Sequence, residues 1–343
     1  MPTPTSSLAS RIGSCQLSCR IHRGHLVPPT SETTEEDQVL HQTRDIHKAK
    51  SATWSAQQLT GSFNIVRFIL LGYEDGGQDT EIVARVPYHP LDRSEDWINA
   101  QTNCIAASEV ASMEYVDFHT NILVPRVIAY NAEKDGGGVG SPYILMTKME
   151  GKPLFKFWEG MGDGKRECIL SQVVDILLQL SALRFDGTGV LMRKEGSLGH
   201  FKSKDQWYIA QKSTIYSPKD PNTDAFMHQV FKSGADYWIT YANVRLESCD
   251  KEHFFGQVNK SFEYAMLWFL CSLIPTLIDP SLDAEGFPIF HGDFHSQNIL
   301  VADLDTPSPR ITAVIDWEFT ATDCTSSSII RFGTKTTLCE KEI

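Results

Sequence analysis

The stretch from residue 290 to residue 318 decides the fold. It reads Phe290-His291-Gly292-Asp293-Phe294-His295-Ser296-Gln297-Asn298-Ile299-Leu300-Val301 and, after a polar turn, Ile311-Thr312-Ala313-Val314-Ile315-Asp316-Trp317-Glu318. The two apolar runs predict short buried strands, and the Asp- and Pro-rich segment between them predicts a turn. Such a hairpin carries Asp293 and Asn298 before one strand and Asp316 after the other. We therefore expect these three polar side chains to converge.

This arrangement suits phosphoryl transfer. A carboxylate such as Asp293 orients an acceptor hydroxyl and takes its proton, while Asn298 and Asp316 hold Mg²⁺ against nucleotide phosphates. Two alternatives are a surface loop with chance acidic residues and a His-rich metal site. The second has little support, because no Cys or further His lies at ligand spacing from His291 and His295.

The pattern His-Gly-Asp-x-x-x-x-Asn, followed by an apolar strand and Asp-Trp-Glu, resembles the aminoglycoside phosphotransferase family and its fungal phosphotransferase members. That family is a branch of the protein-kinase-like fold. The resemblance implies an α+β protein with two lobes: a small N-lobe with an antiparallel sheet plus a helix, and a mostly helical C-lobe. It also implies ATP and Mg²⁺ as cofactors and a structural role for His291 in bracing the loop.

Earlier in the chain, the apolar run 65–71, a Gly-rich turn at 72–77 and the run 81–87 predict a strand-turn-strand unit. The resemblance assigns the segment before the first strand to the loop that covers the nucleotide, formed by Gly61, Ser62, Phe63 and Asn64. It also places Arg85 on the third strand, where the wider kinase pattern has Lys, and this Ala-Arg-Val-Pro version is familiar in fungal members. The alternative for Arg85 is an outward-facing charge.

Residues 106–118 predict a helix, since Val110, Met113 and Val116 recur on one face. By resemblance Glu109 pairs with Arg85 to hold it over the phosphates, with Glu114 as the fallback and a solvated helix face as the alternative for both. Strands are expected at 122–130 and 142–151. The resemblance then makes the end of the second strand a hinge that binds adenine, formed by Met146, Thr147, Lys148 and Met149. For Met146, core packing is the alternative.

The rest of the chain predicts a helical lobe. Apolar spacing indicates helices near 165–184, 226–246 and 256–279, with a polar surface loop over 192–225. The apolar segment 264–278 is shorter than a bilayer requires and contains Pro275, so no transmembrane span is expected. We divide the chain into a disordered tail at 1–50, an N-lobe at 51–150 and a C-lobe at 151–343.

Composition narrows the class of protein. The chain has 343 residues and a formal net charge of -12, and this negative charge argues against a nucleic-acid binder. Its eight cysteines are scattered along the chain, which favours reduced thiols. The first 31 residues contain Arg but no Asp or Glu, a bias compatible with a mitochondrial transit peptide. An unstructured N-terminal tail is the other interpretation of this segment. We expect a cytoplasmic protein, with a mitochondrial one as the alternative. We also expect a monomer or dimer. Only 25 residues follow Glu318, fewer than the family's continuation, so a truncated C-terminus is expected.

The leading hypothesis is an ATP- and Mg²⁺-dependent phosphotransferase that moves the γ-phosphate to a hydroxyl of a small molecule. The alternative is a catalytically impaired kinase-like binding or regulatory protein, or a truncated product. The choice of substrate depends on loops that differ between proteins of the same fold. The sequence therefore does not identify the acceptor.

Overall fold

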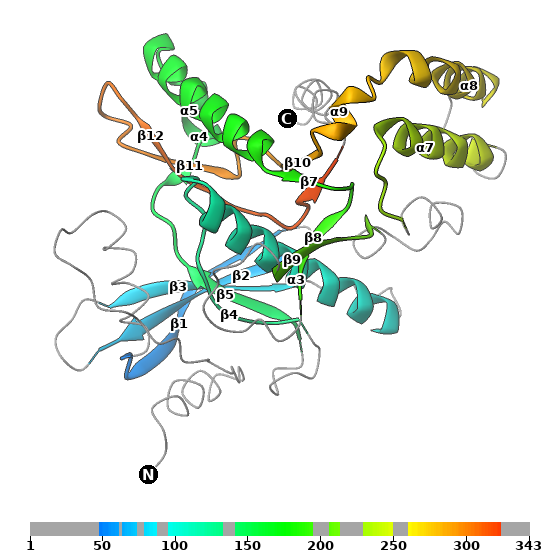
Figure 1. Ribbon diagram of the computed structural model, residues 1–343. Coiled ribbons are helices and arrows are strands. Elements are labelled where there is room, and N and C mark those ends of the chain that lie inside the picture. The colour runs from blue at the N-terminus through cyan, green and yellow to red at the C-terminus, as the bar shows by residue number, and fades with distance from the viewer. Residues whose placement is uncertain are drawn as a thin grey trace. The chain divides into compact units, whose positions relative to one another are not determined.

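Strand β2 (Asn64–Gly72) lies inside the main sheet, and six of its nine residues are apolar. In the computed structural model this sheet has the order β1-β2-β3-β5-β4, with antiparallel neighbours (Figure 1). The other strands are β1 (Ser51–Thr60), β3 (Thr80–Pro87), β4 (Val127–Asn131) and β5 (Tyr143–Thr147). The structure describes residues 48–61, 64–73, 79–87, 95–132, 141–194, 206–212, 229–249 and 260–323.

The chain forms two units whose segments alternate in sequence. Unit 1 comprises residues 1–172, 193–207 and 294–318, and unit 2 comprises 173–192, 208–293 and 319–343. The predicted α+β class is confirmed by the antiparallel sheet of unit 1 and the helices described here.

Alternation along the strands builds the core of unit 1. Ile69, Leu71, Ile82 and Ala84 are each at most 3% exposed, while the intervening Leu70 is 39% exposed. Side chains on a strand alternate between faces, so one face of the sheet is packed and Arg85 points to the face opposite that of Ala84. The core also includes Ala49, which lies just before the N-lobe boundary expected at residue 51.

Helix α3 (Glu95–His119) lies against β4 and β5 (Figure 1). The predicted periodic residues Val110, Met113 and Val116 are all buried. Two strand predictions need correction. The strand expected at 122–130 begins only at Val127, and β1 falls on residues 51–60, where no strand was expected.

The hairpin that the sequence predicted is present in unit 1. Strand β11 (Ile299–Ala302) pairs antiparallel with β12 (Arg310–Val314), in a register that sets Ile299 opposite Val314. The short strand β6 (Lys152–Pro153) pairs with the other edge of β11. Helices α4 (Phe155–Trp158) and α5 (Asp163–Ala182) follow β6.

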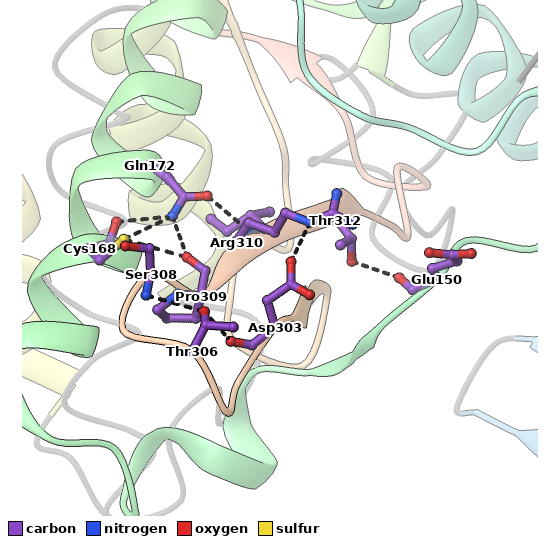
Figure 2. A network of polar contacts seen from close by, with 10 residues as sticks. Glu150, Cys168, Gln172, Asp303, Thr306, Ser308, Pro309, Arg310 and Thr312 are labelled. Carbon is purple, nitrogen blue, oxygen red and sulfur yellow. Dashed lines mark hydrogen bonds and ion pairs between the residues drawn. The ribbon is translucent and has the colours of Figure 1, made fainter. Parts of the chain in front are cut away.

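Polar contacts fix this hairpin in place (Figure 2). The Gln172 side chain of α5 donates from Nε2 to the Pro309 carbonyl (2.9 Å) and accepts from the Ile311 N–H (2.8 Å). Thr312 Oγ1 donates to the Glu150 carbonyl (2.6 Å), which ties β12 to the segment after β5. The turn itself is closed by an ion pair between Arg310 and Asp303 (2.6 Å).

Unit 2 contains the three-stranded sheet β13-β10-β7 and the later helices. Its strands are β7 (Arg184–Phe185), β10 (Phe287–Phe290) and β13 (Ala321–Thr322), and its helices are α7 (Gly234–Cys249), α8 (Lys260–Leu277) and α9 (Ser281–Ala284). Strands β8 (Val190–Arg193) and β9 (Trp207–Ala210) form a further pair, and β9 and the end of β8 fall in the segment 192–225 that was predicted as a polar loop. A helix was predicted at 226–246, and α7 begins only at Gly234. The first three positions of the predicted helix, 226–228, lie outside the described residues.

Helix α8 packs against α7 but leaves much of its apolar surface exposed. Phe262, Met266, Phe269 and Leu277 are each between 52% and 66% exposed. Among the described residues, no helix combines the length and apolar character needed to cross a bilayer.

A glycine makes the close approach between the hairpin and the segment after β5 testable. Gly151 has φ +106°, and an added Cβ would lie 2.4 Å from Thr312 Oγ1 and 2.9 Å from the Val301 carbonyl oxygen. Gly151→Ala should lower the free energy of unfolding by about 2 kcal/mol or more, measured by urea denaturation. The control is Gly164→Ala in α5, where an added Cβ meets no atom within 4 Å. Equal urea midpoints for the two variants would contradict this account of the fold.

Candidate functional site

One buried guanidinium gathers acidic groups from distant parts of unit 1. Arg85 on β3 is 7% exposed. Its Nη1 donates to Glu109 Oε1 of α3 (2.6 Å) and its Nη2 to Asp316 Oδ1, which follows β12 (2.7 Å). Nη2 also pairs with Glu318 Oε2. The structure thus brings Arg85 and Glu109 together, as the sequence predicted.

The backbone after β12 is shaped to present Asp316. Asp316 has φ +68°, a left-handed conformation that a non-glycine residue adopts at a cost and that often marks functional positions. Trp317 is fully buried and its Nε1 donates to the Val314 carbonyl (2.9 Å), so the turn is held from inside. Glu318 is consequently drawn inward, with a side chain 3% exposed, whereas the Asp316 side chain remains 36% exposed.

The cluster carries more negative than positive charge. Glu109, Asp316 and Glu318 face the single Arg85, which leaves a formal excess of two negative charges when all are ionised. Burial raises the pKa of Glu109 to about 8, since the lowering effect of Arg85 is opposed by Glu318 and Asp316. Burial also raises the pKa of Glu318. Burial lowers the pKa of Arg85, but its three partners outweigh that effect and the pKa ends above its ordinary value.

The turn between β1 and β2 is tied to the same cluster. The Gly61 N–H donates to the Asn64 carbonyl (2.8 Å), and Asn64 Nδ2 donates to Glu318 Oε2. Two of the four residues predicted to cover a nucleotide, Ser62 and Phe63, lie outside the described residues. Gly61 and Asn64 therefore represent this loop in the structure, and its contact with phosphate stays a prediction.

The predicted metal ligands sit at one end of the hairpin. Asn298 precedes β11 and is 8% exposed, and its carbonyl accepts from the Ile315 N–H (2.9 Å), next to Asp316. In the parts of the chain that the structure describes, no group of three or more His, Cys, Asp or Glu side chains is placed to hold a metal ion. A site here would therefore combine an amide, one carboxylate and oxygens from outside the protein, which is usual for Mg²⁺.

The predicted base, Asp293, belongs to unit 2. Its N–H donates to Nδ1 of the buried His291 (3.2 Å), so His291 braces this loop. The adjacent Gly292 lets the backbone of this loop lie close to the backbone of Phe319, because a Cβ added at Gly292 would lie 2.0 Å from the Phe319 carbonyl oxygen. The role of Asp293 as a base stays a prediction.

The predicted hinge residues are held mainly by contacts within unit 1. Thr147 exchanges two bonds with Arg126: its N–H donates to the Arg126 carbonyl and its Oγ1 accepts from the Arg126 N–H, both at 2.9 Å. Met146 is 6% exposed within β5, and Lys148 pairs with Glu81. Met149 lies 3.8 Å through its sulfur from Thr147 Oγ1. Binding of adenine at these positions stays a prediction.

Two carboxylates differ from the sequence interpretation. Glu114, the fallback partner of Arg85, pairs instead with Arg193 (2.9 Å). Glu318 was read only as part of the Asp-Trp-Glu motif, yet it contacts both Arg85 and Asn64. The only signal for its contact with Arg85 in the sequence is its position two residues after Asp316, and nothing in the sequence indicates its contact with Asn64.

Comparison with curated proteins gives partial matches, and no family model matches the chain. A subtelomeric hrmA-associated cluster protein of Aspergillus fumigatus is 29% identical over 307 residues, covering 77% of this chain and 57% of the relative. The mitochondrial Altered inheritance of mitochondria protein 9 of Debaryomyces hansenii is 30% identical over 118 residues, which is 34% of this chain and 18% of that protein. The chain therefore spans little more than half of the first relative and a small part of the second.

Solved structures overlap the chain loosely. A candidate aminoglycoside phosphotransferase from Ralstonia eutropha has a TM-score of 0.46 and 15% identity, covering 84% of this chain and 66% of that one. Choline kinase from Cryptosporidium parvum has a TM-score of 0.37 and 14% identity, covering 81% and 61%. Both TM-scores are below 0.5.

The raised pKa of Glu109 predicts how stability depends on pH. Its ordinary value is 4.5 and its folded value about 8, so between these pH values the folded state holds a proton that the unfolded state has lost. Stability should therefore fall as pH rises from about 5 to 8, by at most about 1.4 kcal/mol per pH unit from this group. Arg85 adds no slope in this window because it stays protonated in both states.

Urea unfolding at several pH values, with Glu109→Gln as the comparison, measures this slope. Gln resembles the protonated acid, so the variant should lose the part of the slope that comes from residue 109. Parallel curves for the two proteins between pH 5 and 8 would mean that Glu109 titrates normally.

Proposed function

We propose that this chain is an ATP- and Mg²⁺-dependent phosphotransferase that moves the γ-phosphate to a hydroxyl group of a small molecule. The observation that carries the proposal is the meeting of β3, α3 and the segment after β12 at the guanidinium of Arg85. Phosphoryl transfer needs little covalent help from a protein and depends on positioning and charge stabilisation. Arg85, held by Glu109 of α3 and next to Asp316, the proposed metal ligand, would supply both the positioning and the charge stabilisation.

Arg85 would hold the nucleotide phosphates. Glu109 fixes one arm of the guanidinium, and the planar fork of Arg suits phosphate oxygens. Among the described residues, the buried Nε of Arg85 has no hydrogen-bond partner, which leaves a donor for a ligand. The loop at Gly61, Ser62, Phe63 and Asn64 would cover these phosphates with backbone N–H groups.

The residues present fit Mg²⁺. Asn298 and Asp316 provide hard oxygen donors at one end of the hairpin, and the surrounding cluster has a formal excess of negative charge. When bound, the ion would neutralise charge on the phosphate oxygens during transfer. The half-exposed Asp316 carboxylate, held by its left-handed backbone, would be its main anchor.

The remaining roles are assigned as follows. Asp293 would orient the acceptor hydroxyl and accept its proton. Met146, Thr147, Lys148 and Met149 would line the site of the adenine base. The net charge of -12 would attract a cationic acceptor more than an anionic one, and it argues against a nucleic-acid partner. We propose a monomer or dimer.

We propose a mitochondrial location as the alternative to a cytoplasmic one. Altered inheritance of mitochondria protein 9 of Debaryomyces hansenii is named as mitochondrial, which favours the mitochondrial alternative over a cytoplasmic location. Fractionation of cells that express the full chain with a C-terminal tag separates the two locations.

A second candidate function is nucleotide binding without turnover. The observation that favours it is the pairing of Arg85, the residue standing where kinases have Lys, with three acidic side chains at once. Such a protein would regulate partners through its nucleotide state. It would bind MgATP as tightly as the enzyme but would show no transfer to any acceptor.

Two variants test the proposal. Asp316→Ala removes the carboxylate assigned to the metal, so calorimetric titration should show the affinity for MgATP reduced by about 100-fold or more. Asp293→Asn should leave MgATP binding nearly unchanged but lower ATP turnover by at least about 100-fold, because it removes only the proton acceptor.

Thermal unfolding of each variant serves as the control for folding. Unchanged MgATP binding in a folded Asp316→Ala protein would contradict the metal assignment. MgATP binding without turnover in the wild type would support the second candidate instead.

A further inference from the structure

Glu318 holds a position that the proposed chemistry does not use. Its side chain is 3% exposed, and a single oxygen, Oε2, accepts from Nη2 of Arg85 and from Nδ2 of Asn64. Asp316 binds the same Nη2 atom through Oδ1. The arm of Arg85 that Glu109 does not hold is therefore shared by two carboxylates.

We propose that Glu318 is a specificity-determining residue, which makes the site accept a polyphosphate only together with a divalent cation. This inference rests on the proposed function and deepens it. Asp316 and Glu318 occupy the anion-binding arm of Arg85, so a free polyphosphate would have to displace a buried, hydrogen-bonded carboxylate. A metal-complexed polyphosphate brings the positive charge that compensates both acids.

The charges explain the selection. In a poorly solvated site, like charges a few ångströms apart repel strongly. A polyphosphate without a bound divalent cation is therefore disfavoured beside Glu318 and Asp316. A site that opposes the wrong ligand with a repulsive group gains specificity even when affinity suffers. Glu318 acts through its charge on Arg85, and its bond to Asn64 ties the start of β2 to the same cluster.

The tether and the charge have separate consequences, so two variants distinguish them. Glu318→Gln keeps the shape of the side chain and an oxygen that accepts from Arg85 and Asn64, but it removes the charge. Asn64→Ala removes the tether and keeps the charge. Glu114→Gln, on the same helix as Glu109 but paired with Arg193, controls for the change in net charge.

The experiment is calorimetric titration of the full chain with ATP, once with excess Mg²⁺ and once with EDTA. The wild type should bind ATP at least about tenfold more tightly with Mg²⁺. In Glu318→Gln this ratio should shrink by about tenfold, because binding in EDTA becomes tighter. Glu114→Gln should keep the wild-type affinities and their ratio. Asn64→Ala alters the loop proposed to cover the phosphates, so it should weaken ATP binding in both conditions and leave the ratio unchanged. Titration of the wild type with inorganic tripolyphosphate should show the same requirement for Mg²⁺.

The contrary outcomes are distinct. A wild-type ratio in a folded Glu318→Gln protein, or loss of the ratio in Asn64→Ala, would overturn the role of the Glu318 charge. Should Glu318→Gln fail to fold, equal binding of tripolyphosphate with and without Mg²⁺ by the wild type would overturn it as well. Absence of any ATP binding by the wild type in Mg²⁺ would instead remove the proposed function itself.

Discussion

The burial of one cation constrains unit 1. A guanidinium withdrawn from water is stable only if carboxylates pair with it in good geometry, and Arg85 meets this condition with partners on α3 and after β12. The strand β3, the helix and the hairpin must therefore take one mutual arrangement. Removal of Arg85 would leave three acidic side chains without their cation, which makes the cluster costly to alter and sensitive to what binds beside it.

The scaffold around the cluster limits movement of Asp316. Gln172 and Thr312 anchor the hairpin at β12 (Figure 2). The buried Trp317 fixes the turn that follows β12. The left-handed backbone of Asp316 is tolerated because these contacts determine the neighbouring residues. A site built in this way has its acidic groups positioned before any ligand arrives, and positioning is the main demand of phosphoryl transfer.

The sequence predicted those features that depend on local pattern. Short apolar runs bounded by turn residues predicted β2, β3 and the β11–β12 hairpin, and the family resemblance implied the pairing of Arg85 with Glu109. Contacts between distant segments were not predictable in the same way. Asn64 and Glu318 are 254 residues apart, and neither spacing nor composition indicates that they bond. Strand β1 escaped detection because its mixed polar sequence lies at a sheet edge and buries little surface.

The most direct measurement is an anomalous difference map from crystals of the full chain grown with ADP and Mn²⁺, which substitutes for Mg²⁺ and scatters anomalously. The account predicts a metal peak bound by Asn298 and Asp316, with the diphosphate in contact with Arg85 and Glu109 still paired to it. A nucleotide bound elsewhere, or a metal peak away from Asp316 with Arg85 still held by Asp316 and Glu318, would contradict it.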